Sequence, residues 1–197
     1  MKRTGLVVLV VVLVLAGVGM LVFGSYISAR NQMVAKNEQI KASWSQVEVV
    51  MQRRADLIPN LVATVQGFAA HETTVFSDIA NARAALLGAH DPKSKIAANG
   101  QLDGALGHLL MIAEAYPQLR SNQNFLQLQD ELAGTENRIA VERRRYNQTL
   151  QDYNTFIGLF PNSIWAGIAG FHRNNDYFQG NAAAQQVPKV DFSGASK

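Results

Sequence analysis

RRADLIPNLV, residues 53–62, places a proline inside a stretch whose apolar residues repeat like those of a helix. Ile58 and Leu61 keep helical spacing on either side of Pro59, whereas a loop at the proline would usually shift the register. Proline within a helix removes one backbone hydrogen bond, here to Ala55, and crowds the carbonyl that would accept it. The pattern therefore predicts a helix that continues through Pro59 and is kinked there.

The same spacing extends far beyond this stretch in both directions. Steps of four and three residues alternate through Met33, Asn37, Ile40, Trp44, Val47, Met51, Arg54, Ile58, Leu61, Val65, Phe68, Glu72, Val75, Ile79, Ala82 and Leu86. Such alternation is typical of the apolar seam of a helix packed against other helices. We therefore expect one helix over residues 29–87. The alternative is two helices, with Pro59 in the first turn of the second, where proline is well tolerated.

An apolar run of 22 residues without a charge, 6–27, follows Lys2 and Arg3 near the start of the chain. About 20 apolar residues in a helix cross the hydrocarbon layer of a membrane. A cleaved signal peptide is the alternative, but its apolar run is usually about 7–15 residues long and ends in a small-x-small site. Residues 25–29 offer no such site, so we expect residues 1–28 to be an uncleaved membrane anchor.

Two further long helices follow, separated by turn residues. Gly88 can end the first helix, and Asp91-Pro92 is typical of a helix start. We expect one helix from Pro92 to Tyr116, before Pro117, and another from Ser121 or Asn122 to Pro161. No convincing strand pattern occurs, so the fold class is all-α. Residues 180–197 have too little apolar content to fold alone and are predicted to be a flexible tail.

Charge and cysteine usage exclude some classes of function. Without Lys2 and Arg3, 16 basic residues face 15 acidic ones. This balance is not that of a nucleic-acid-binding protein, which needs a basic face. The chain has no cysteine, which excludes disulfides and thiolate sites.

Several multi-residue motifs resemble those of LemA family proteins and occur in the same order. They are RRADLIPNLV (53–62), HE (71–72), AR (82–83), AYPQL (115–119), TENRIAVERRRYN (135–147), YN (153–154) and FP (160–161). The resemblance covers roughly residues 26–180. It implies a single-pass protein of the bacterial inner membrane, with an N-terminal span and an up-and-down antiparallel helical bundle over residues 29–179. It also implies links to membrane shaping, to membrane proteases and to TPM-domain proteins.

Polar residues within these motifs and on the seam are the candidate structural or interaction residues. They are Arg54, Asp56, Pro59, Asn60, Glu72, Glu136, Asn137, Arg138, Glu142, Tyr146 and Asn147. Arg54, Glu72 and Glu142 stand where a bundle needs apolar side chains, so we expect them to be paired or partly exposed. One interpretation is that they fix the register between helices. The other is a polar site beside Pro59 that includes the freed Ala55 carbonyl.

Motifs of catalysis and metal binding are absent from the sequence. His71-Glu72 begins a zinc-protease motif, but Val75 stands where the second histidine is required. None of the four histidines follows a glutamate at the spacing of a di-iron bundle. We therefore predict a non-catalytic scaffold or adaptor without a cofactor. The alternative is a hydrolase or metal-dependent enzyme with a site near Arg54, Pro59 and Glu72.

The short apolar segment 163–171 has two interpretations. It contains Ile164, Trp165 and Ile168 at helical spacing, which would suit an amphipathic helix lying in a membrane interface. The polar face of such a helix would have no basic neighbours to favour a lipid surface. We therefore expect it to dock onto the bundle.

Helix lengths predict self-association. At about 1.5 Å per residue, a helix over 29–87 would be close to 90 Å long, against about 37 and 60 Å for the two later helices. An apolar stripe would then stay open beside the membrane. We expect a homo-oligomer with contacts at Met33, Ile40, Trp44 and Val47. The basic tip at Lys2 and Arg3 favours a bundle outside the cytoplasm.

Overall fold

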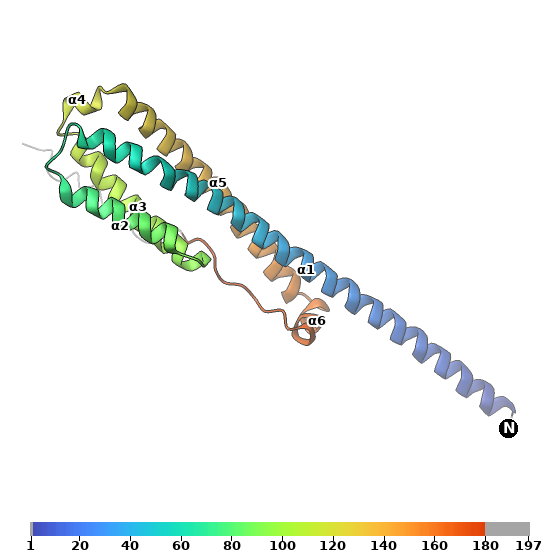
Figure 1. The fold of residues 1–197 in the computed structure, drawn as a ribbon. Helices are drawn as coiled ribbons and strands as arrows, with labels where there is room; N and C mark the ends of the chain where they lie inside the picture. The colour runs from blue at the N-terminus through green and yellow to red at the C-terminus, as the bar shows by residue number, and fades with distance from the viewer. Residues whose placement is uncertain (1, 180–197) are drawn as a thin grey trace, which may run out of the picture.

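The computed structural model describes residues 2–179, with side chains from residue 5 onward. The elements are α1 (Lys2–Gln66), α2 (Thr73–Gly88), α3 (Pro92–Ala113), α4 (Pro117–Arg120), α5 (Gln123–Gly158) and α6 (Asn162–Ala169) (Figure 1). No strand occurs in this part of the chain, so the predicted all-α class is confirmed. The predicted tail, 180–197, lies outside the described residues.

The helices run up and down along one very long first helix. α5 lies antiparallel beside α1, and the hairpin of α2 and α3 packs against the half of α1 that is far from its N-terminus (Figure 1). The short α4 connects α3 to α5 at the far tip, and α6 packs against both α1 and α5 at the other end. The first part of α1 projects alone from the bundle (Figure 1).

α1 passes through Pro59 without interruption, so the prediction of a continuous helix there is confirmed and the alternative start at Pro59 is wrong. The prediction that this helix reaches residue 87 is also wrong. α1 ends at Gln66 and the chain reverses before Thr73. The carbonyl of Val65 accepts from the backbone N–H groups of both Phe68 and Ala69, at 3.0 and 2.9 Å, which tightens the last turn.

The starts of α3 and α5 are confirmed. The Asp91 side chain accepts a hydrogen bond from the backbone N–H of Ser94 at 2.9 Å, and Pro92 takes the first helical position. The Asn122 side chain accepts from the backbone N–H of Phe125 at 3.1 Å. Both caps satisfy backbone donors that have no partner within the helix.

The core forms mainly where α1 and α5 face each other. On α5 the buried residues include a seven-residue repeat, Phe125, Leu132, Ile139, Tyr146 and Tyr153. This spacing keeps one face of α5 against the seam of α1. Burial raises the pKa of the Tyr146 hydroxyl to about 12.

The four predicted oligomer contacts belong to this core, which corrects the expectation of an open stripe. Met33, Ile40, Trp44 and Val47 are all buried within the single chain. The length argument failed because α1 ends at Gln66. From residue 29 to its end, α1 is then about 57 Å long, and α5 alone is about 54 Å long. These four side chains are not available to a second copy in this fold.

A strap, residues 171–179, completes the cover of α1 near the end from which its apolar part projects. Gly170 adopts a left-handed conformation with φ 76°, which ends α6 and turns the chain back along the bundle. The ring of Phe178 then stacks on Trp44, with ring centres 5.8 Å apart. The strap lies beside α5 and was not predicted from the sequence.

Two asparagines on α5 hold the strap by pairing with its backbone. The Asn147 amide donates to the Phe178 carbonyl at 2.8 Å and accepts from the Phe178 N–H at 2.9 Å. The Asn154 amide makes the same pair with Asn174, at 2.6 and 2.9 Å. Each side chain therefore satisfies both polar groups of one strap residue, as a neighbouring strand would. The prediction that Asn147 has a structural role gains its physical basis here.

Asn147→Asp should loosen the strap. The change keeps the acceptor for the Phe178 N–H but sets a carboxylate oxygen against the Phe178 carbonyl. Loss of the donor and the new repulsion should cost about 1–3 kcal/mol. Hydrogen exchange should quicken at residues 174–178, while Asn137→Asp on the exposed face of α5 should leave it unchanged. Equal protection in both variants would contradict this role of Asn147.

Candidate functional site: an ionic cluster in the bundle core

Arg54 joins three helices from inside the bundle. It lies on the seam of α1 and is only 6% exposed. Its Nη1 atom is 2.5 Å from Oδ1 of Asp103 on α3, an ionic contact that is not aligned as a hydrogen bond. The same nitrogen donates a hydrogen bond to Glu136 on α5. Arg54 therefore has its two partners on two different helices, and this cluster is the site at which α1, α3 and α5 are tied together.

The acidic side of the cluster is itself supported from α3. The Asn99 amide, fully buried, donates to Oδ2 of Asp103 at 2.9 Å. Burial raises the pKa of Asp103, and the positive charges of Arg54 and Arg143 oppose that shift. Asp103 was missed in the sequence because it lies between the apolar positions of α3 and pairs with a residue far away in the chain.

Arg143 borders the cluster on α5, where its charge acts on Asp103, and Glu142 precedes it. The guanidinium of Arg143 lies 5.1 Å from the centre of the Phe178 ring, which is within the range of a cation–π contact. Glu142 is half-buried, as expected for a charge on the seam. The Arg143 contact connects the strap to the side of α5 that carries the cluster.

A second polar contact replaces the hydrogen bond that Pro59 removes. The Arg83 side chain of α2 donates from Nε to the Ala55 carbonyl at 2.8 Å. This is the carbonyl that the sequence marks as freed, because Pro59 has no N–H to donate. Arg83 stands in the AR motif but was not among the predicted site residues. The missing signal is that a freed buried carbonyl requires a donor from another element.

Glu72 lies in a different place from the cluster. It precedes α2 in the turn at the tip, where it accepts a hydrogen bond from the Tyr116 hydroxyl at 3.1 Å, which raises the pKa of Tyr116. α1 ends about 18 Å beyond Arg54 before this turn begins. The structure therefore does not combine Arg54, Pro59 and Glu72 into one site, as the enzyme alternative requires.

The remaining predicted residues lie mostly on the surface. Asp56, Pro59, Asn60, Asn137 and Arg138 are exposed. Asp56 accepts a hydrogen bond from Gln52 at 2.9 Å on the same helix. A salt bridge that the sequence did not indicate joins α3 to α1: Nζ of Lys95 lies 2.5 Å from Oε1 of Glu48. Of the predicted residues, only Arg54 and Glu136 meet directly in the cluster.

A groove of about 240 Å³ adjoins the cluster. Leu61, Leu106, Leu110 and Leu132 line most of it, and Arg54 and Glu136 form its polar edge. Within residues 5–179, no group of three or more metal-ligating side chains is placed to hold an ion. The cluster can bind helices to one another, and we identify no arrangement of nucleophile and base beside it.

The fold and the cluster together define an antiparallel helical bundle built on an apolar N-terminal helix and tied by a central arginine. The chain belongs to the LemA family, whose model matches residues 43–192. It is 31% identical over 175 residues to the magnetosome proteins MamQ 1 and MamQ 2 of Paramagnetospirillum magneticum. It is 24% identical over 136 residues to the protein LemA of Metamycoplasma hominis.

The matches extend over most of this chain and less of each relative. The MamQ alignment covers 76% of this chain and 64% of each relative. The LemA alignment covers 68% of this chain and 62% of the relative. The chain therefore spans less than two thirds of the length of these relatives.

Arg54→Met should destabilise the bundle by about 2–3 kcal/mol, because Asp103 and Glu136 lose the cation that they share. The loss is not larger because both carboxylates are partly exposed to water. Arg138→Met, on the exposed face of α5, is the matched control and should change stability by less than about 0.5 kcal/mol. Urea unfolding of the full chain in detergent measures both. Equal stability of the two variants would remove the assigned role of Arg54.

Arg83→Met should destabilise wild type more than it destabilises Pro59→Ala. In wild type the change leaves the Ala55 carbonyl without its donor, at a cost of about 1–3 kcal/mol. In Pro59→Ala the new N–H can bond that carbonyl within the helix. A double-mutant cycle by urea unfolding gives the coupling. Additive losses would show that Arg83 and Pro59 act independently.

Proposed function

We propose that this chain is a single-pass membrane protein whose bundle is a non-catalytic scaffold. The observation that carries the proposal is the continuity of α1, 65 residues long, from the apolar run into the centre of the bundle. An 18-residue window of this helix has a mean hydropathy of 3.2 and none of it is buried. About 20 such residues suffice to cross the hydrocarbon layer.

Anchor and core helix are one element, which suits a scaffold. A helix without a break holds the bundle at a fixed angle and distance from the membrane, whereas a flexible linker would let it move freely. The chemistry of the cluster agrees, because Arg54 uses its charge on Asp103 and Glu136. The role of Arg54 is then to hold the helices in their relative positions and not to bind a substrate.

The relatives support the same class of function. MamQ 1 and MamQ 2 are named for a cell structure, the magnetosome, and not for a reaction. We propose that the scaffold acts by assembling with itself or with other membrane proteins. A membrane protease, a TPM-domain protein and a role in membrane shaping are the specific cases that the family resemblance implies.

We place the protein in the bacterial inner membrane, with the bundle outside the cytoplasm. Lys2 and Arg3 favour the cytoplasmic side. Arg30, Lys36 and Lys41 oppose them on the bundle side, so the difference is small. Protease added to intact spheroplasts should degrade the bundle, and protection until lysis would reverse the orientation.

Photo-cross-linking in the native membrane tests the scaffold directly. Cross-linkable residues at the exposed positions Val49, Met111 and Val141 sample three helices. We expect discrete adducts with a second copy or with another membrane protein, identified by mass spectrometry. A Gly-Ser insertion between Ser28 and Ala29, where the expected anchor ends, should reduce them, because it uncouples the bundle from the anchor. No adduct at any position, together with a small molecule or metal retained by the purified chain, would favour the enzyme alternative.

A further inference from the structure

The corner between α5 and α6 exposes large apolar side chains. Leu159, Phe160, Ile164 and Ile168 lie within ten residues of one another and are 51–82% exposed. The prediction that this segment docks onto the bundle therefore holds for only one face of α6. Trp165 and Ala166 pack onto the bundle, while Ile164 and Ile168 face outward. A contiguous apolar surface of this kind marks a contact with a partner or a membrane.

The corner lies at the level where α1 leaves the apolar run. The rings of Tyr26 and Trp165 meet edge to face, with centres 5.6 Å apart, so α6 is level with the last turn of residues 6–27. That run is about 33 Å long as a helix, close to the roughly 30 Å of the hydrocarbon layer. Tyrosine and tryptophan are also the residues enriched at membrane–water interfaces.

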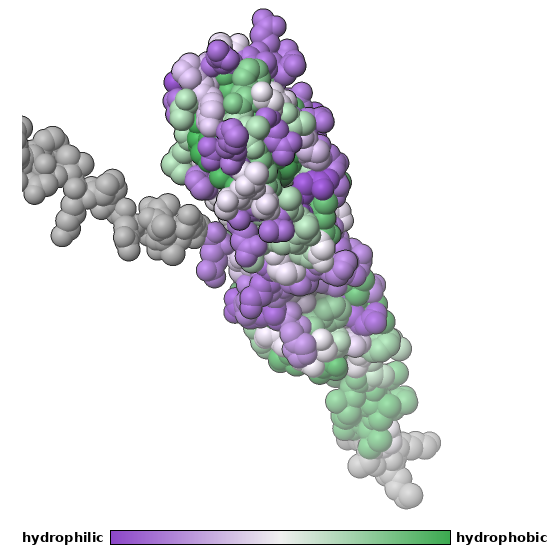
Figure 2. Space-filling view, turned by 60° about the vertical axis from the view of Figure 1, so that its left-hand side comes forward, coloured by the Kyte–Doolittle hydropathy of each residue, from purple (hydrophilic) through white to green (hydrophobic). Residues whose placement is uncertain are grey.

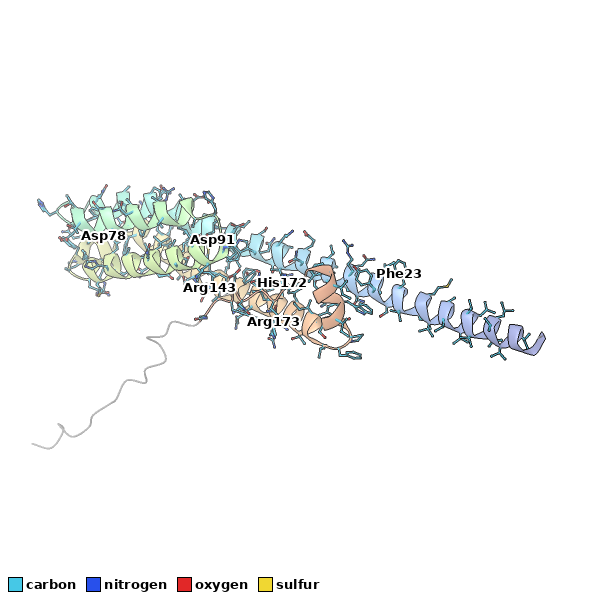
Figure 3. All side chains as sticks on the ribbon, turned by 90° about the horizontal axis from the view of Figure 1, so that it is seen from below. Phe23, Asp78, Asp91, Arg143, His172 and Arg173 are labelled. Carbon is cyan, nitrogen blue, oxygen red and sulfur yellow. The ribbon has the colours of Figure 1, made fainter. Side chains whose placement is uncertain are left out.

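The views of the molecule agree with this placement. Figure 3 shows α6 between Phe23, on the bare part of α1, and His172 and Arg173, at the start of the strap. Figure 2 shows the apolar colour of the projecting helix continuing onto the adjacent end of the body. The corner therefore lies beside the end of the proposed membrane span, where Tyr26 meets Trp165.

Charge around the corner is of one sign. Residues 23–37 and 155–173 contain no aspartate or glutamate and include Arg30, Lys36 and Arg173, while Glu38 and Asp152 lie just outside these two segments. Lys36 lies 5.4 Å from the centre of the Phe156 ring, which places its charge above the corner. The fold thus adds Arg30 and Lys36 of α1 to Arg173, which follows α6 in the sequence. Anionic lipid headgroups attract these basic residues, whereas the same residues on a second copy would repel them.

We propose that residues 159–168 form a second membrane contact, with their apolar side chains in the lipid interface and the basic residues among the headgroups. The partner is a lipid surface that contains anionic lipid. The inference rests on the proposed span in α1, and it adds a contact off the axis of that helix. Two contacts fix the tilt of the bundle, which a single span leaves to be set by its surroundings.

Spin labels measure this contact, because the chain has no cysteine. Single cysteines at Phe160, Ile164 and Ile168 receive a nitroxide in the full chain, in nanodiscs of phosphatidylethanolamine and phosphatidylglycerol. Met111, near the far tip and 67% exposed, is the water control, and Phe23 is the lipid control. Each labelled variant should unfold at the wild-type temperature, since all these positions are exposed.

We expect the ratio of oxygen to nickel-chelate accessibility to be several-fold higher at the three corner positions than at Met111. A ratio equal to that of Met111, with Phe23 in lipid, would overturn the membrane contact alone. Exclusion of both reagents from the corner would also overturn it, because protein would then cover the surface. Nickel accessibility at Phe23 would instead remove the span and with it the proposed function.

Discussion

The structure depends on covering the apolar seam of α1. A helix of this length is not held by its own hydrogen bonds in water, because most helical stability in proteins comes from packing of one face. The seam from Ala29 to Val65 is buried except at Asn37, which is partly exposed. α5 covers it along most of its length, and two shorter covers complete the far and near halves. The contacts of Arg54 and the Lys95–Glu48 pair join these covers to α1.

The two shorter covers meet end to end in the middle of α1. The strap ends against Trp44 through Phe178, and the hairpin begins at Glu48 through Lys95. A groove of about 540 Å³ between them is lined by Lys93 and Ile96 of α3 and by Tyr177 of the strap. Arg54 lies less than two helical turns beyond Glu48 on α1. There Asp103 of α3 and Glu136 of α5 both contact the Arg54 guanidinium. The ionic cluster therefore fixes the position of the hairpin relative to the longer pair.

Apolar spacing predicted the features that are set within one helix and missed contacts that form between two elements. The passage of α1 through Pro59 and the caps at Asp91 and Asn122 follow from neighbouring residues. The turn at 67–72 could not be predicted in this way. Ala69 takes the buried position expected for Phe68, and the apolar spacing continues in phase after the turn, so the sequence shows no break. In the cluster, Arg54 and Glu136 were predicted, whereas Asp103 was not.

The strap and the Arg83 contact were missed for a different reason. Residues 172–179, HRNNDYFQ, carry little apolar content, so no period indicates that they pack. Their order comes from the amides of Asn147 and Asn154 on another element. Arg83 likewise acts on a carbonyl 28 positions away. Contacts between side chain and distant backbone leave no periodic trace in a sequence.

The continuity of α1 also makes the molecule a lever. The part of α1 beyond residue 27 is about 58 Å long, and the proposed span would tilt with a change in bilayer thickness wherever the proposed contact at residues 159–168 does not hold it. A change in tilt of about 10° would then carry the tip of the bundle sideways by roughly 10 Å. The turn with Glu72 and Tyr116 sits at that tip. Bilayer thickness would thus be read out as the lateral position of a surface far above the lipid.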